Sequence, residues 1–246
     1  MKEEDFSRLK EKMAIAITIL TYELADMWGH VSVRGPDSKH FLLRHLRPPG
    51  DESVPPDDVL EFDLGGKRTS GRRERPDEIF FYVCPYRVKK EVGSVIHCHP
   101  PMALALTAAG QKIIPIHQDS VNFGKHVPVA PWLYGYWRDH GEKAVKLMGD
   151  NCALMIMGHG ALVVGKTIEE ACMNMVHLER TAKMILQARG SAKLRSISPS
   201  VAKRLLSVAG SGAKETRRER RSGGPALLEW SYYESMVKRG ERWSRL

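Results

Sequence analysis

The sequence contains no long apolar run. No segment approaches the ~18 consecutive apolar residues that a membrane-spanning helix needs. The first residues, Met1 to Asp5, are too acidic for a signal or transit peptide. We therefore expect a globular protein that does not enter a membrane and that stays in the cytoplasm.

Cysteine is scarce and irregularly placed. No Cys-x-x-Cys spacing occurs among the four cysteines, which are Cys84, Cys98, Cys152 and Cys172. Their neighbours are mostly apolar, which is typical of small buried side chains. This usage predicts a protein of a reducing compartment.

Positive and negative residues balance over most of the chain, so neither sign is in excess there. Residues 1–188 hold 24 basic and 24 acidic residues, so the net charge of +9 comes entirely from residues 189–246. The densest basic run, Lys214 to Arg221, lies between Gly-rich segments and has no aromatic residue that could stack on a base. Such a run is typical of a solvated linker, and we expect no nucleic-acid partner.

The remaining pattern alternates short strands with helices. At 246 residues and 42% hydrophobic, the chain can bury one sizeable core. The expected helices are 3–27, 77–90 with a kink or delayed start at Pro85, 102–107, 137–149 and 168–189, the last beginning with a Thr167/Glu170 capping box. The expected strands are 30–34, 40–44, 58–63, 95–100, 113–116, 126–130, 154–157 and 161–164, with a loop over 46–57. This order indicates one α/β layered domain over residues 1–190 and a basic C-terminal extension over residues 191–246.

Two histidines stand one residue apart in the β-branched run Val95 to Pro100. On a strand, His97 and His99 share one face while Ile96 and Cys98 turn to the other. The pair could be half of a metal site, or simply a solvated strand face. A third histidine decides between these interpretations.

His159 lies between Gly158 and Gly160, and apolar runs flank this short motif on both sides. Glycine on each side allows a sharp turn and leaves the imidazole room to reach a ligand. Three neutral imidazoles with one open coordination position are typical of a catalytic divalent metal rather than a closed structural site. We therefore predict that His97, His99 and His159 bind a metal.

Together these motifs resemble the class II aldolase/adducin family. The resemblance covers roughly residues 5–190 and rests on His97-Cys98-His99-Pro100, then Val127 to Pro131, then Gly158 to Gly165 followed by a helix with Glu170-Ala171. It implies a three-layer α/β/α domain, a cyclic homotetramer and a divalent metal, zinc first, with Mn, Fe, Co or Mg as alternatives. It also implies an acid/base glutamate 19 residues before the first metal histidine, which here is Glu78 rather than Glu74.

The departures from the family's sugar-phosphate aldolases concern the phosphate site. Where those enzymes carry small hydroxyl residues, this chain has Gly29-His30, the segment Arg44 to Gly50, and Pro76-Asp77. Proline removes an N–H donor and aspartate repels an anion, so a phosphorylated substrate is disfavoured. The aldolase tyrosine is replaced by Trp132, and Tyr134, which lies nearby, joins Glu78 as a predicted catalytic residue.

The altered pocket suits a planar carboxylate. Arg44, His45 and Arg47 could hold a carboxylate and Trp132 could pack on a ring, although the two arginines could equally be surface cations. His30 and Arg34 lie in a stretch, Gly-His-Val-Ser-Val-Arg, that resembles the family's decarboxylases of aromatic or ring-cleaved acids. The Trp230/Tyr232/Tyr233 tail could close over the ligand or pack outside as an extra helix.

We therefore expect a divalent-metal-dependent carbon–carbon lyase, a decarboxylase of a catechol-type or ring-cleaved aromatic carboxylic acid. Its expected partner is a small anionic, aromatic substrate. The alternatives are an aldolase or dehydratase acting on a hydroxy-keto compound, phosphorylated or not, in the manner of fuculose-phosphate aldolase. A non-haem iron oxygenase and a non-catalytic adducin-like module are further alternatives.

Overall fold

The computed structural model describes residues 3–45, 59–72, 74–188, 194–210 and 225–243. Its strands are β1 (His30–Arg34), β2 (His40–His45), β3 (Leu60–Asp63), β4 (Arg68–Ser70), β5 (Ser94–Cys98), β6 (Val129–Ala130), β7 (Ala153–Ile156) and β8 (Gly160–Gly165). Within the described ranges these strands form one sheet in the order β4-β3-β2-β1-β5-β8-β7-β6. Among the strands of the described residues, only the β6–β7 pair is parallel. The sheet is therefore an antiparallel-rich α/β sheet with β5 in its interior.

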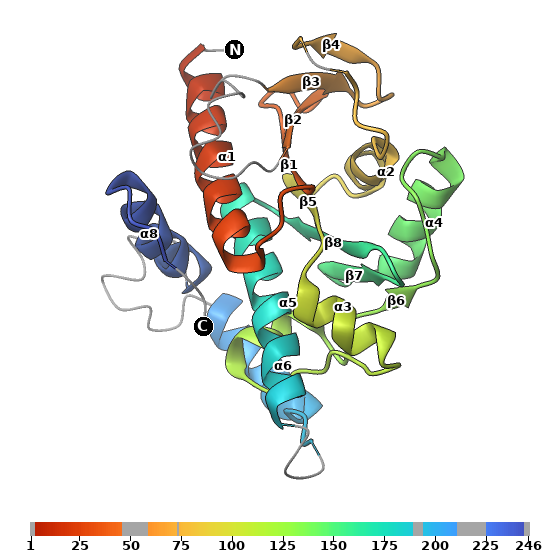
Figure 1. The fold of residues 1–246 in the computed structure, drawn as a ribbon, viewed down its shortest axis with the longest axis vertical. Coiled ribbons are helices and arrows are strands. Elements are labelled where there is room, and N and C mark those ends of the chain that lie inside the picture. The colour runs from red at the N-terminus through yellow and green to blue at the C-terminus, as the bar shows by residue number, and fades with distance from the viewer. Residues whose placement is uncertain (1–2, 46–58, 73, 189–193, 211–224, 244–246) are drawn as a thin grey trace.

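Helices cover both faces of this sheet. They are α1 (Glu3–Leu24), α2 (Phe80–Val88), α3 (Pro101–Ala108), α4 (Arg138–Met148), α5 (Ile168–Ala188), α6 (Pro199–Gly210) and α8 (Pro225–Lys238), with the 3₁₀ helix η1 (Gln118–Phe123). One apolar core lies between the sheet and α1 and α5, and a second lies between the sheet and α2 and α4 (Figure 1). The α/β fold expected from the sequence is confirmed, in three layers.

The strand register brings histidines of three strands into one row. His30 of β1 pairs with His45 of β2 on one side and with His97 of β5 on the other. Residues directly opposite each other in a sheet project to the same face. Their neighbours Val31 and Ile96 project to the other face and join the core under α1 and α5.

Helix α5 begins close to the predicted cap. Thr167 Oγ1 accepts a hydrogen bond from the Glu170 N–H at 3.2 Å, while the Glu170 carboxylate accepts one from the Lys166 N–H at 3.0 Å. The glutamate thus reaches one residue further back than a capping box requires. Helix α2 begins at Phe80 rather than Asp77 and continues through Pro85.

Prolines explain the strands that do not form. The expected strand 113–116 contains Pro115, which has no N–H to donate. Its carbonyls accept isolated backbone bonds from two different segments, Ile113 O from Val127 N–H at 3.0 Å and Pro115 O from Ile197 N–H at 2.8 Å, so no ladder forms. Of the expected strand 126–130, which contains Pro128, only Val129–Ala130 is a strand. The expected loop 46–57 and the basic run Lys214 to Arg221 lie outside the described residues.

The end of the chain packs on the outer helices. Helix α8 lies against α1 and α5 (Figure 1) and buries Trp230 and Tyr233 in the core beneath them. The Tyr233 hydroxyl donates to Glu23 Oε1 at 2.8 Å, and the Trp243 indole N–H donates to the same oxygen at 3.1 Å. Of the two interpretations of the tail, this arrangement is the externally packed helix. None of the helices in the described ranges is long and apolar enough to cross a bilayer.

Candidate metal centre

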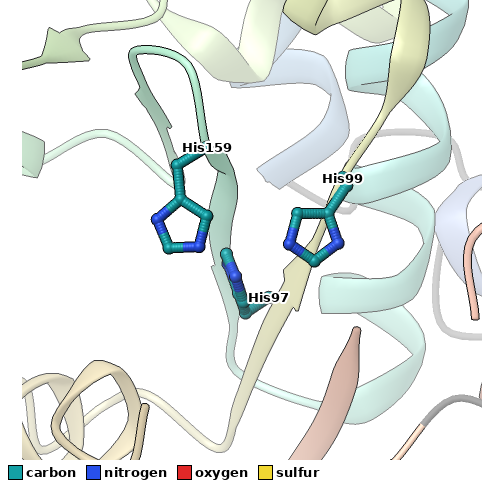
Figure 2. Close-up of side chains that lie close together, drawn as sticks. All are labelled: His97, His99 and His159. Atoms are coloured by element: carbon teal, nitrogen blue, oxygen red, sulfur yellow. The ribbon is translucent and has the colours of Figure 1, made fainter. Parts of the chain in front are cut away.

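Three histidines converge at one end of strand β5. His97 lies within β5 and His99 directly follows it, while His159 occupies the turn between β7 and β8. Gly158 has a φ of 66°, so the turn uses the left-handed region that glycine favours. One ring nitrogen of each imidazole lies within 4.8 Å of those of the other two. Figure 2 shows the three rings facing a common space.

Backbone carbonyls fix the orientation of two of these rings. His97 Nδ1 lies 2.9 Å from Ala161 O, and His159 Nδ1 lies 2.7 Å from Leu133 O. A carbonyl oxygen only accepts, so Nδ1 carries the proton in both rings. Each Nε2 therefore keeps its lone pair, as a metal ligand requires.

The third ring is held by a carboxylate. Asp26 lies in the segment between α1 and β1, and its oxygens lie 3.2 and 3.3 Å from His99 Nδ1. The same side chain accepts the backbone N–H of His99 at 2.8 Å and that of Trp28 at 2.9 Å. Burial raises the pKa of Asp26, but these bonds outweigh it and lower the pKa to about 2. Asp26 is therefore ionised at neutral pH.

Glu78 faces the same centre from the start of α2. Its Oε1 lies 3.0 Å from His159 Nε2 and its Oε2 lies 3.2 Å from His97 Nε2. Burial raises the pKa of Glu78, but the contacts with His159 and His97 lower it well below its usual range. Burial lowers the pKa of His159, whereas Glu78 raises it, and the net change is upward.

These residues fit a divalent cation. His97 Nε2 and Glu78 Oε1 are buried, yet neither makes a hydrogen bond, since the short contacts lack hydrogen-bond angles. Buried polar atoms without a partner are costly. A cation held by the three Nε2 lone pairs, with a carboxylate beside it, would satisfy both atoms.

Two glycines allow this close packing. A Cβ on Gly160 would lie 2.9 Å from His97 Cε1 and 3.0 Å from His99 Cδ2. A Cβ on Gly135 would lie 2.7 Å from Glu78 O. The positions of the two ligand rings and of the glutamate therefore depend on residues without side chains.

A cavity of about 400 Å³ opens beside the metal centre. It is lined by Met27, Trp28, His30, His45, Pro76, Asp77, Glu78, His99 and Tyr134. The His30 and His45 rings are 4.2 Å apart, and His30 is only 6% exposed with neither ring nitrogen hydrogen-bonded. Burial, with His45 and His97 nearby, lowers the pKa of His30 well below its usual value. A neutral, unpaired imidazole thus lies in the cavity wall.

Two aromatic side chains lie together near the metal centre. The Tyr134 hydroxyl lies 3.4 Å from Asp77 Oδ2, and burial and the nearby carboxylates raise the pKa of Tyr134. Trp132 is 55% exposed and stacks on Tyr134 with ring centroids 6.1 Å apart. Tyr134 therefore lines the cavity, whereas Trp132 packs on Tyr134 and is not among the lining residues.

The predicted arginines do not come to this cavity. Arg34 donates hydrogen bonds to the backbone oxygens of Tyr86 and Val92, both at 2.8 Å. Its guanidinium therefore binds carbonyls at and after the end of α2 instead of facing the cavity. Arg44 follows the strand alternation and lies on the opposite face of β2 from His45. Arg47 lies outside the described residues. Of the side chains predicted to bind a carboxylate, which are Arg44, His45 and Arg47, His45 lines this cavity, with His30 beside it.

Sequence reasoning missed Asp26. The only signal was electrostatic, because a carboxylate two residues after the end of α1 lies near the negative end of the helix macrodipole. An acidic residue in that unfavourable place indicates a compensating partner.

Comparison with known proteins identifies the family. Residues 21–186 match the family described as Class II Aldolase and Adducin N-terminal domain. The chain belongs to this family. This match confirms the family resemblance inferred from the three sequence motifs, His97 to Pro100, Val127 to Pro131 and Gly158 to Gly165.

Relatives within the class II aldolase family include decarboxylases. A 3,4-dihydroxyphthalate decarboxylase from Arthrobacter keyseri is 26% identical over 194 residues, which cover 72% of this chain and 77% of the relative. A 3-oxo-tetronate 4-phosphate decarboxylase from Escherichia coli O6:H1 is 27% identical over 139 residues, 54% of this chain. The chain spans 65% of the length of that second relative.

A solved structure shares the class II aldolase fold. L-fuculose 1-phosphate aldolase from Glaciozyma antarctica PI12 superposes with a TM-score of 0.73 over 97% of this chain and 92% of that chain. The two sequences are 21% identical. This likeness establishes the arrangement of strands and helices.

Proposed function

We propose that this protein is a divalent-metal-dependent carbon–carbon lyase that decarboxylates a catechol-type or ring-cleaved aromatic carboxylic acid. One observation carries the proposal: three imidazoles and the Glu78 carboxylate meet beside a cavity whose lining includes His99, Glu78 and His30. The kinship with a 3,4-dihydroxyphthalate decarboxylase supports the same chemistry.

His97, His99 and His159 would hold the metal through their Nε2 atoms. A divalent metal supplies Lewis acidity there, stabilising negative charge that develops on a substrate oxygen. Zinc is our first candidate because three imidazoles with an open position form the usual ligand set of catalytic zinc. Manganese, iron, cobalt and magnesium are the alternatives.

Glu78 would move the proton. It is a carboxylate at neutral pH, because His159 and His97 hold its pKa low despite its burial. It can therefore accept the proton of a substrate hydroxyl as the substrate binds. When the bond to the carboxyl carbon breaks, the electron pair stays on the ring or enol carbon and CO2 leaves. Glu78 then returns the proton to that carbon, and the substrate oxygen that gave up the proton leaves with the product as an oxyanion.

The cavity walls favour a carboxylate over a phosphate. Among the described residues that line the cavity, none is a lysine or arginine, and Asp77 would repel a dianion. Neutral His30, whose ring nitrogens are not hydrogen-bonded, can donate one hydrogen bond to a carboxylate oxygen. Trp132 and Tyr134 offer flat apolar surface for a ring.

An aldolase acting on a hydroxy-keto acid is the second candidate. Its support is the Tyr134 phenol in the cavity, whose raised pKa keeps it protonated and able to donate. The same metal ligands and Glu78 would serve both reactions. We further propose a cytoplasmic homotetramer, in which neighbouring subunits would cover exposed aromatic residues such as Trp28 and Trp137.

The deciding experiment combines elemental analysis with product detection. Purified protein would be assayed for bound metal and then for CO2 release from a panel of dihydroxybenzene carboxylates, with H97A as the metal-binding control. We expect about one metal per chain and CO2 release that H97A loses. Release of an aldehyde or loss of water from hydroxy-keto acids would favour the aldolase or dehydratase. Oxygen consumption would favour an iron oxygenase, and absence of metal from the intact chain would refute the proposal.

A further inference from the structure

The segment joining α1 to β1 carries a strained residue. Ala25 has a φ of 52°, a left-handed conformation that is unfavourable for a residue other than glycine. This backbone turn sends the Asp26 side chain inward, where it is 6% exposed. Two residues further on, Trp28 is 72% exposed and lines the cavity. The strain therefore separates an inward carboxylate from an outward indole.

The Asp26 carboxylate accepts from three N–H groups. They are the backbone N–H of His99 at 2.8 Å, the ring Nδ1 of His99 at 3.2 Å, and the backbone N–H of Trp28 at 2.9 Å. Each of these partners needs an acceptor, and an ionised carboxylate is acceptor-only. The geometry thus requires the proton of His99 to be on Nδ1.

The tautomer of His99 decides whether this ring can bind a metal. With Nδ1 protonated, Nε2 keeps a lone pair, whereas the other tautomer would point an N–H at the cation. His97 and His159 obtain the same tautomer from backbone carbonyls, which no substitution removes. His99 alone depends on a side chain for it, and that side chain is 73 residues away in the sequence.

We propose that Asp26 is the positioning residue of the metal centre, holding His99 in the Nδ1–H tautomer with Nε2 directed at the cation. The inference rests on the proposed metal site. It goes further in assigning a role to a residue outside the ligand set. It also ties the cavity segment that carries Trp28 to the same carboxylate. Outer carboxylates of this kind typically change metal affinity by 10–100-fold.

Metal affinity of Asp26→Asn tests the inference. An asparagine keeps the shape but presents an amide NH2 in place of one oxygen, so it cannot accept from all three groups. We expect its affinity for Zn²⁺, measured by competition with a chromophoric chelator, to fall about 10–100-fold. Circular dichroism would check that the fold is retained. Wild-type affinity in the folded variant would overturn the proposal.

The matched control is Asp37→Asn. Asp37 makes the same set of contacts in the β1–β2 turn: His40 Nδ1 at 2.6 Å, and the N–H groups of Lys39 and His40 at 2.9 and 3.1 Å. It lies at the opposite end of these strands from His30 and His45. We expect its Zn²⁺ affinity to equal that of the wild type, and an equal loss in both variants would overturn the proposal.

A second measurement needs no variant. Long-range ¹H–¹⁵N NMR of ¹⁵N-histidine-labelled wild-type protein without metal reports which ring nitrogen carries the proton. We expect the Nδ1–H tautomer for His99, and the Nε2–H tautomer would overturn the inference even if Asp26→Asn fails to fold. Should wild-type protein bind no Zn²⁺ while His99 has the Nδ1–H form, the proposed function fails and the metal role of Asp26 fails with it.

Discussion

The carboxylate of Glu78 bridges two imidazoles of the metal centre, with Oε1 3.0 Å from His159 Nε2 and Oε2 3.2 Å from His97 Nε2. The glutamate is not itself among the clustered ligands, which are histidines. It therefore lies where it can reach both a substrate and the ligand rings. This division of roles predicts that proton transfer and metal binding are separable.

Glu78→Gln should abolish turnover while the metal stays bound. The amide retains the shape of the side chain but cannot take a proton, so we expect kcat to fall at least about 100-fold. Metal content would be measured in the same preparation. Glu74→Gln is the matched control, because Glu74 is exposed four residues earlier in the chain. Full activity in Glu78→Gln, or an equal loss in Glu74→Gln, would contradict the assignment.

Gly135→Ala should displace Glu78 through the backbone. The new Cβ would lie 2.7 Å from Glu78 O and 2.8 Å from Phe81 Cγ, distances at which the chain must shift. We expect a destabilisation of about 1–3 kcal/mol together with a lower kcat, measured by urea unfolding and steady-state assay. Gly110→Ala is the control, since its Cβ meets nothing within 4 Å. There, the left-handed φ of 68° should cost stability without costing activity.

His30→Leu should weaken substrate binding without destabilising the fold. Both ring nitrogens of His30 are without hydrogen bonds in the described structure, so removing them leaves no buried group unpaired. We expect Tm to be unchanged or higher and KM to rise about tenfold, the equivalent of one lost hydrogen bond of ~1.4 kcal/mol. A lower Tm with unchanged KM would mean that His30 is structural.

Tyr233→Phe should loosen α8 without affecting catalysis. The substitution removes the hydrogen bond that the Tyr233 hydroxyl donates to Glu23 Oε1. We therefore expect the free energy of unfolding to fall by about 1 kcal/mol. KM should not change, because α8 packs on the outer helices rather than on the cavity. Tyr232→Phe is the neighbouring control, since Tyr232 is 62% exposed. An increase in KM for Tyr233→Phe would instead support a tail that closes over the ligand.

The stabilising effect of Glu229 should disappear in acid. Burial raises its pKa, but His177 at 2.6 Å and Arg180 at 2.8 Å lower it to about 2. A carboxyl whose folded pKa is depressed stabilises the protein above its unfolded pKa of about 4.3, and this stabilisation is lost as the pH falls toward 2. The free energy of unfolding of the wild-type protein should therefore exceed that of Glu229→Gln by about 2 kcal/mol at pH 6. The difference in Tm should shrink between pH 4.5 and 3.

The control for this pH dependence lies on the same helix. Glu234 pairs with Lys238 one turn away at 2.8 Å, and its side chain is 31% exposed. Glu234→Gln should lower Tm little at any pH, because partly exposed pairs of this kind contribute little. A pH-independent deficit in Glu229→Gln would show that the charge of Glu229 is not what stabilises α8.

The sequence predicted the parts of the site that depend on local periodicity. Strand alternation placed His97 and His99 on one face, and Gly158 predicted the turn that carries His159. The same alternation also separates Arg44 from His45, so the two could never have faced one cavity together. The contact of Asp26 with His99 spans 73 residues and has no local pattern. Pro115 shows that a β-branched run does not become a strand when it lacks a donor.

Strand β5 pairs with β1 on one side and β8 on the other, and neither neighbour is local in sequence. Contacts between distant segments carry a large loop-closure cost and slow the folding of sheets. During synthesis, the imidazole of His159 becomes available only after the ribosome has passed the other two by about sixty positions. We therefore expect a cation to bind after β5 and β8 have paired, so that its supply changes activity more than it changes the yield of native chains.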